Sequence, residues 1–279
     1  MTPLFCFIDD AEFELRNFRE HAAGAFAPAR VVYASTFDQA VAAIGEGPVV
    51  GFLLDIYGAD PEMDQPRLPD ERELAGRVGS TGQVAALYQD LGQGPEAFNT
   101  FLRRLYGRVQ VWQEAFGQAA RGLGQGRAYG LYNLARAREH FPWAACLGYS
   151  RKALYADGAA MTAAGAEGVL QKPQGNDDAA IAEATRRQAP ELAKALARAV
   201  DRRLAAALTP LAARWLAEPA SETAGRQVLA ELAALAGGGA GEGADWDLVE
   251  RAAARAGLRA GEAAGLRALR AWRGARPAG

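Results

Sequence analysis

Four short apolar runs, each followed by polar or charged residues, constrain the fold of this chain most strongly. Two of them are 4–8 and 49–54, and the others lie near 143–149 and 168–171. The residues that close the four runs are, in chain order, Asp9 with Asp10, Asp55, Ser150, and Lys172 with Pro173. Parallel strands that are buried on both faces have continuous apolar sequences, and their carboxyl ends share one edge of the sheet. We therefore expect these side chains to converge at the edge where open α/β sheets bind ligands.

The residues expected at this edge favour a magnesium and phosphate site. Carboxylates that crowd together repel one another unless a cation lies among them. Oxygen ligands close to a phosphate favour Mg²⁺ over zinc or copper. The two cysteines, Cys6 and Cys146, fall inside predicted buried strands, and the chain has only two histidines, so the usual zinc spacings are absent.

The first 55 residues alternate between strand and helix patterns. Strands are predicted at about 3–8, 30–34 and 49–54, with a helix starting at Ala11 and a second one over about 36–44. Two βαβ crossovers, each right-handed by default, follow from this alternation. The sequence thus predicts an α/β fold with a parallel, doubly wound sheet.

The alternation is interrupted after Asp55. The stretch 59–70 carries three prolines among acidic residues and is predicted to be a loop, and the next strand pattern begins only at Trp143. A crossover with its loops needs roughly 20 to 30 residues, so we interpret 59–141 as a helical insertion. Its apolar stripe is Phe98, Leu102, Leu105, Val109, Trp112 and Phe116. We expect the stripe to pack on neighbouring helices; a cofactor or partner groove is the alternative.

Helical patterns dominate the carboxy-terminal part of the chain. Residues 142–205 complete the sheet domain, with a last helix that Pro190 is predicted to begin, and 206–279 form a separate helical region. Residues 181–279 carry 15 Lys and Arg against 11 Asp and Glu, and 1–180 carry 16 against 22. The basic part would suit nucleic acid, but its arginines are spread singly along Ala-rich helices. We therefore rank DNA binding below contact with a protein.

The residues that close the last two runs carry a family resemblance. A hydroxyl residue ends the fourth strand, the stretch 164–168 reads Ala-Gly-Ala-Glu-Gly, and a Lys-Pro pair follows 22 residues after the hydroxyl. Together with Asp9, Asp10 and Asp55, this resembles the phosphoacceptor site of two-component response regulator receiver domains. The resemblance covers 1–58 and about 142–205. It implies a flavodoxin-like sheet of five parallel strands in the order 2-1-3-4-5.

The resemblance also implies a role for each residue. Asp55 would be the nucleophile that accepts a phosphoryl group from a phosphohistidine. Asp9, Asp10, Asp55 and the backbone carbonyl of Tyr57 would hold Mg²⁺. Lys172 would place a positive charge on the phosphoryl oxygens, Pro173 after a cis bond would help to aim it, and Ser150 would donate its hydroxyl. The expected partners are a sensor histidine kinase or phosphotransfer protein and a protein effector, which the helical insertion or the carboxy-terminal helices would contact. A homodimer is a further candidate.

Three positions separate the chain from the family pattern. Val169 stands where receivers carry an aromatic switch residue, and Tyr57 and Gly58 replace the common Met-Pro. A degenerate receiver that acts as a phosphorylation-independent adaptor is therefore the alternative. A haloacid dehalogenase-type phosphatase is rejected because its second acid would fall at Tyr57. We expect no enzyme activity beyond the protein's own phosphorylation and dephosphorylation.

Composition places the chain among globular proteins. Hydrophobic residues make up 50% of its 279 residues, which is normal for a chain with a sizeable core. No apolar stretch approaches the roughly 18 residues that a membrane span requires. The first apolar run is short and lacks a basic region before it, so we expect neither a signal peptide nor a membrane partner, and a cytoplasmic location.

Overall fold

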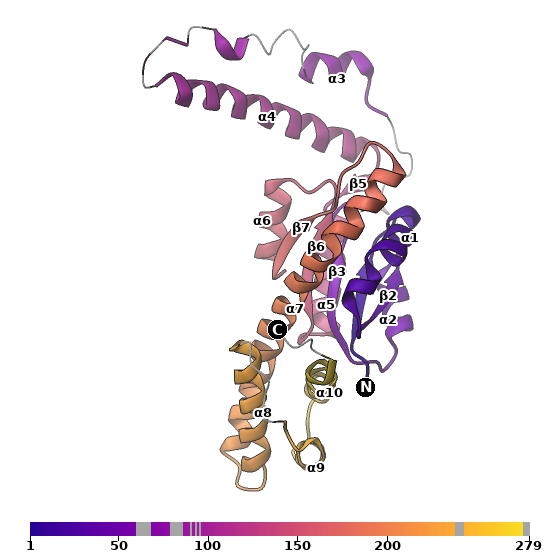
Figure 1. Ribbon diagram of the computed structural model, residues 1–279, viewed down its shortest axis with the longest axis vertical. Helices are drawn as coiled ribbons and strands as arrows, with labels where there is room; N and C mark the ends of the chain where they lie inside the picture. The colour runs from indigo at the N-terminus through magenta and orange to yellow at the C-terminus, as the bar shows by residue number, and fades with distance from the viewer. Residues whose placement is uncertain are drawn as a thin grey trace. The chain divides into compact units, whose positions relative to one another are not determined.

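The computed structural model describes residues 1–59, 68–78, 86–89, 91–92, 94, 96–237 and 243–275. Most of the loop predicted over 59–70 lies outside these ranges. The chain divides into two compact units (Figure 1). The first combines Met1–Gly58 with Arg127–Gly279, and the second is Ala59–Gly126.

The first unit is built on a sheet of five parallel strands in the order β2-β1-β3-β6-β7. The strands are β1 (Leu4–Ile8), β2 (Arg30–Ala34), β3 (Val49–Leu54), β6 (Ala145–Ser150) and β7 (Gly168–Gln171). Every residue of β1, β3 and β6 is buried, as expected for central strands covered on both faces. The α/β prediction with a five-stranded parallel sheet is therefore confirmed.

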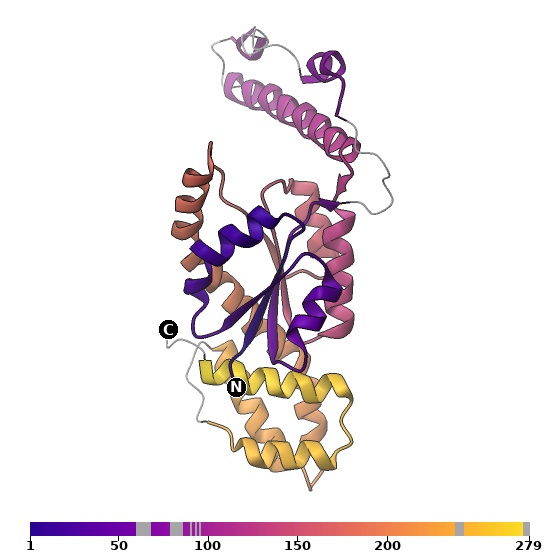
Figure 2. The same ribbon diagram turned by 90° about the vertical axis from the view of Figure 1, so that its right-hand side faces the viewer.

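Helices cover both faces of this sheet (Figure 2). On one face, α1 (Glu12–His21) packs against α7 (Asp178–Leu216), and the Asn17 amide donates a 2.9 Å hydrogen bond to the Thr185 hydroxyl between them. On the other face, α2 (Phe37–Ile44) packs against α5 (Ala128–His140). The last crossover helix, α6 (Tyr155–Ala163), packs on the edge strand β7.

Helix α5 belongs to the first unit, which contains the five-stranded sheet and is called the sheet unit below. It falls within the segment that was predicted as an insertion. It packs on β3, β6, α2 and α6, and Leu134 and Ala137 are fully buried. The segment 59–141 therefore divides after residue 126, because the apolar face of α5 completes the helical layer over the sheet.

One continuous helix replaces the two that were predicted around Pro190. Helix α7 runs through both Pro190 and Pro210. An interior proline normally weakens a helix, since it removes one backbone hydrogen bond and crowds the preceding turn. Here side chains on both sides of Pro190 pack into the core and hold the helix together: Thr185, Ala189, Leu192 and Leu196 are buried. The prediction of a helix boundary at Pro190 was wrong.

The carboxy-terminal helices belong to the first unit. They are α8 (Glu222–Ala236), α9 (Trp246–Arg255) and α10 (Ala260–Ala275), and they follow α7, which extends past the boundary predicted at residue 205. Helix α8 lies along α7, and α10 contacts α7 and β3. The Trp272 ring meets Phe5 edge to face at 5.7 Å, and its indole nitrogen donates a 2.8 Å hydrogen bond to Asp201. Residues 206–275, as far as they are described, thus share the core of the sheet unit.

The second unit is helical. It contains α3 (Glu71–Val78) and α4 (Ala97–Gly122), which pack against each other. A separate two-stranded sheet pairs β4 (Gly58–Ala59) with β5 (Gln125–Gly126). Within the described ranges, no helix combines the length and the apolar character needed to cross a membrane.

Candidate functional site

Three aspartates meet at the carboxyl edge of the two central strands. The register of β1 and β3 pairs Ile8 with Leu54, so Asp9 and Asp55 follow neighbouring strand ends. The Asp55 amide donates a 2.9 Å hydrogen bond to the Ile8 carbonyl, which fixes this alignment. One carboxylate oxygen from each of Asp9, Asp10 and Asp55 lies within 4.8 Å of the others. The structure therefore brings together the three carboxylates that the sequence placed at this edge.

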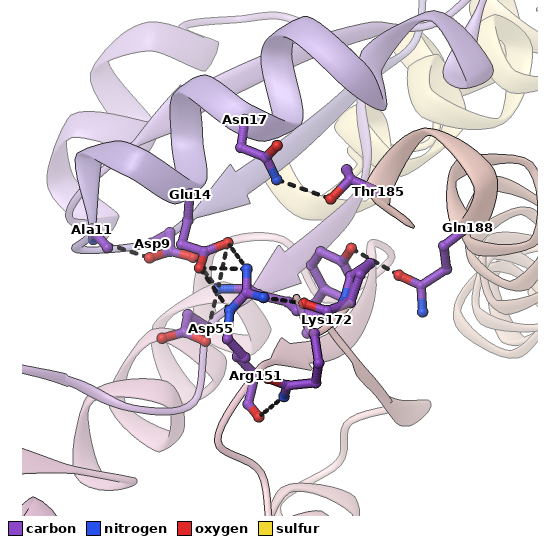
Figure 3. A network of polar contacts seen from close by, with 12 residues as sticks. Asp9, Ala11, Glu14, Asn17, Asp55, Arg151, Lys172, Thr185 and Gln188 are labelled. Atoms are coloured by element: carbon purple, nitrogen blue, oxygen red, sulfur yellow. Dashed lines mark hydrogen bonds and ion pairs between the residues drawn. The ribbon is translucent and has the colours of Figure 1, made fainter. Parts of the chain in front are cut away.

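Lys172 reaches this cluster from the end of β7. Its Nζ lies 3.1 Å from Asp55 Oδ1, forms an ion pair with Asp9 Oδ2, and lies 4.0 Å from Glu14 Oε2 (Figure 3). The rings of Phe7 and Tyr149 lie 5.6 and 5.9 Å from the same nitrogen. Lys172 is almost fully buried, so its ammonium group depends on these carboxylates and rings for its solvation.

Burial and charge change the acidity of this cluster. The pKa of Asp9 is raised to about 7, mainly by burial; the nearby Lys172 lowers it and the nearby Asp55 raises it. Burial by itself would lower the pKa of Lys172, but Asp9, Asp55 and Glu14 outweigh burial and raise it. The lysine thus stays protonated.

Ser150 lies at the end of β6, next to Lys172 on the neighbouring strand. The Lys172 amide donates a 3.1 Å hydrogen bond to the Ser150 carbonyl, and the register pairs Ser150 with Gln171. The Ser150 hydroxyl is buried and has no hydrogen-bond partner in the described structure. A buried hydroxyl without a partner is costly, which makes this oxygen available to a ligand at the strand ends.

Two charged residues near the site were not predicted. Arg151 donates hydrogen bonds from two guanidinium nitrogens to Glu14, at 2.9 to 3.2 Å, and a third contact to the Pro173 carbonyl. This arginine connects α1 with the segments that follow β6 and β7 (Figure 3). The only signal in the sequence was the position of Arg151 directly after Ser150.

The expected cis bond before Pro173 was wrong: in the described residues the cis peptide bond is Ala27–Pro28.

The segment after Asp55 contacts α6. The Tyr57 hydroxyl donates a 2.9 Å hydrogen bond to Asp157 Oδ2, and both residues are buried. The same oxygen accepts a 2.9 Å hydrogen bond from the Leu154 amide at the start of α6. The sequence placed the backbone carbonyl of Tyr57 at the metal site, and that placement stays a prediction; the contact made by its side chain was not foreseen.

The amino end of α5 closes the other side of the same segment. Gly130 donates a 3.2 Å hydrogen bond to the Ile56 carbonyl, and a Cβ at Gly130 would come within 2.8 Å of the Asp55 carbonyl oxygen. Tyr129 donates a 2.8 Å hydrogen bond to the Ser35 carbonyl. Burial raises the pKa of Tyr129, and Asp10, Asp9 and Asp55 add to the shift, so its ring lies within their field.

The donor set of this edge fits a divalent cation. Asp9, Asp10, Asp55 and Glu14 supply four carboxylates, against two cations from Lys172 and Arg151. Oxygen donors with a surplus of negative charge suit Mg²⁺, which one or two carboxylates and a phosphate commonly hold.

Comparisons of the chain with protein-family models, with curated proteins and with solved structures found no match.

Proposed function

We propose that the protein is a response-regulator receiver that accepts a phosphoryl group on Asp55 in two-component signalling. The observation that carries this proposal is the contact between Asp55 Oδ1 and Lys172 Nζ at 3.1 Å, beside the Asp9 and Asp10 carboxylates. A nucleophilic carboxylate, a fixed cation and two further acids at one strand edge suit phosphoryl transfer, which requires mainly positioning and charge neutralisation.

The transfer requires an in-line attack by Asp55. One of its oxygens forms a bond to phosphorus while the bond from phosphorus to the donor histidine nitrogen breaks, and the histidine leaves. The product is an acyl phosphate on Asp55. Lys172 holds the phosphoryl oxygens, and the Ser150 hydroxyl, which has no partner in the structure, donates a hydrogen bond to one of them.

The chemistry that Mg²⁺ supplies here is neutralisation of the phosphoryl oxygens. Asp9, Asp10, Asp55 and the Tyr57 carbonyl would hold it, in keeping with the acidic surplus of the site. Apart from its own phosphorylation and dephosphorylation, the protein would catalyse no reaction.

The topology supports the receiver assignment. Numbered among themselves along the chain, the five strands run in the order 2-1-3-4-5, which is the flavodoxin-like arrangement. The site lies at the carboxyl ends of the strands flanking the point where the order reverses. A sensor histidine kinase or phosphotransfer protein in the cytoplasm is the proposed donor.

Output would pass through protein contacts. Val169 packs against Gly148, where an added Cβ would lie 3.0 Å from a Val169 methyl, and valine cannot make the ring rotation of an aromatic switch. The hydrogen bond from Tyr57 to Asp157 offers a different route, from the segment after Asp55 to α6.

The absence of an aromatic at residue 169 also favours a second candidate function, a phosphorylation-independent adaptor. DNA binding by the basic carboxy-terminal region ranks below both.

Phosphorylation with a small donor tests the proposal. The full-length protein is incubated with Mg²⁺ and acetyl phosphate, and its intact mass is measured beside Asp55→Asn and a control, Asp38→Asn, which removes an exposed carboxylate that contacts Arg136 and does not belong to the acidic cluster. We expect a mass gain of one phosphoryl group in the wild type and the control, and none in Asp55→Asn. No gain in the wild type, or an equal gain in Asp55→Asn, would contradict phosphoacceptor chemistry and favour the adaptor.

A further inference from the structure

Helix α4 carries an apolar repeat with the spacing of a coiled coil. Its members are Phe98, Leu102, Leu105, Val109, Trp112 and Phe116, which follow one another at steps of four, three, four, three and four. A strict seven-residue repeat of this kind forms the seam between two supercoiled helices. We call these six residues the α4 seam.

The α4 seam faces solvent. Its first five side chains are 80, 58, 38, 42 and 55% exposed, and the neighbouring Tyr106 is 63% exposed. The expectation that the stripe packs on neighbouring helices is therefore wrong. Other positions of α4 make the contacts inside the unit: Ala115 is buried, and the Phe101 ring lies 5.1 Å from Tyr88. Figure 1 shows α3 running alongside α4.

The exposed apolar area is large for a solitary helix. Aromatic side chains bury roughly 150 to 250 Å² each, so the exposed fractions of the seam and Tyr106 amount to roughly 600 Å². A monomer seldom exposes more than this in one patch. A stable pairwise interface buries about 800 Å² on each partner, so the seam supplies most of the area that a dimer requires.

The helix itself also favours a partner. Gly107 and Gly117 lie within α4, and a Cβ added at Gly107 would meet nothing within 4 Å. Each interior glycine costs about 1 kcal/mol of helix stability relative to alanine. A helix of 26 residues with two glycines and an exposed seam is stabilised when that seam is buried.

We propose that the α4 seam is a dimerisation surface that pairs with the α4 seam of a second copy of this chain, as a parallel coiled coil. A two-fold axis places the same patch of both copies together, and a heptad seam is complementary to itself. Parallel pairing sets Arg108, at a flanking position, against the uncharged Gln113 of the second copy. Antiparallel pairing would instead set Arg108 against Arg108. Among the described helices, α4 is the one whose exposed large apolar side chains follow this spacing.

This proposal is independent of phosphorylation, and the oligomeric state of the full chain tests it. The molar mass is measured by sedimentation equilibrium for the wild type, Val109→Glu and Gln110→Glu. The two variants place the same charge one residue apart, on the seam and on an exposed position beside it. We expect twice the chain mass of 29.5 kDa for the wild type and Gln110→Glu, and a monomer for Val109→Glu. A monomeric wild type, or a dimer that Val109→Glu leaves intact, overturns the proposal.

Cross-linking provides a second measurement that does not depend on a charged substitution. Cys6 and Cys146 are the chain's two cysteines and are fully buried, so an introduced thiol on α4 is the accessible one. On oxidation we expect Val109→Cys to form a disulfide-linked dimer, because equivalent seam positions face each other in a parallel pair, and Gln110→Cys to remain uncross-linked. Equal cross-linking of both variants, or none in Val109→Cys, overturns the parallel seam.

Discussion

The Tyr57 hydroxyl donates a 2.9 Å hydrogen bond to the buried carboxylate of Asp157, a residue 100 positions further along the chain. The bond joins the segment that follows Asp55 to the first turn of α6. Asp157 also accepts from the Leu154 amide, so a change at the strand edge that moves Tyr57 reaches the helix end directly. Under the proposed function Val169 cannot act as an aromatic switch. The hydrogen bond between Tyr57 and Asp157 would then connect the strand edge with α6.

Tyr57→Phe is expected to weaken the fold and to loosen α6. A hydrogen bond to a charged acceptor contributes about 1.5 to 3 kcal/mol, and its loss leaves a buried carboxylate short of one donor. Urea unfolding measures the first effect, and hydrogen exchange of the Tyr155–Ala163 amides measures the second. Tyr33→Phe is the matched control, since the buried Tyr33 hydroxyl has no partner in the described structure. Equal losses of stability in the two variants would contradict a specific role for Tyr57.

Lys172→Gln is expected to destabilise the protein strongly when no divalent cation is present. At a pH above the pKa of Asp9, removing the cation of a buried pair costs about 3 to 5 kcal/mol, because the Asp9 and Asp55 carboxylates then face each other uncompensated. Mg²⁺ should restore part of this loss by replacing the missing charge. Lys194→Gln removes an exposed ion pair with Glu191 and should cost less than about 1 kcal/mol. Urea unfolding with and without Mg²⁺ checks both; a small effect of Lys172→Gln would show that the cluster is already neutralised.

Asp9 is expected to make the metal-free protein less stable as the pH rises. Its pKa is about 7 in the folded protein and near its usual value of 3.8 when unfolded, so the folded state holds the proton more tightly. Protonated Asp9 adds up to about 4 kcal/mol to the free energy of unfolding. This contribution is complete below about pH 4 and is lost as the pH rises through about 7. Asp9→Asn lacks this titration, so its stability relative to the wild type should increase over that range. Parallel pH profiles, measured by urea unfolding in chelator, would contradict the raised pKa.

Gly130→Ala is expected to disturb the segment that carries Asp55. The added Cβ would lie 2.7 Å from the Ile56 Cα and 2.8 Å from the Asp55 carbonyl oxygen, which are backbone atoms. Such overpacking costs about 1 to 3 kcal/mol and should lower the melting temperature. Gly107→Ala, on an open position of α4, should instead stabilise the protein by up to about 1 kcal/mol. If thermal melts show Gly130→Ala to be as stable as the wild type, the close approach of α5 to Asp55 does not constrain this segment.

The parallel sheet and the residues at its carboxyl edge could be predicted from the pattern of apolar runs. Short apolar runs that alternate with helix patterns are typical of strands buried on both faces, and the residue after each run then lies at the carboxyl edge, so Asp9, Asp55 and Lys172 could be brought together in advance. Sequence pattern is sufficient for this because the residues after each apolar run mark the end of a strand, and a helix between two strands returns the chain so that they run parallel.

The distribution of helices around that sheet could not be predicted in the same way. The periodicity of α4 and α5 predicts an apolar face in each helix, but it does not say what covers that face: α5 packs on β3, whereas the α4 seam is exposed. The pairs Glu14–Arg151 and Tyr57–Asp157 could not be predicted either, because they depend on packing between segments that lie 137 and 100 residues apart in the chain. A sequence specifies which faces must be buried, and only the packing of distant segments against one another decides which partner buries them.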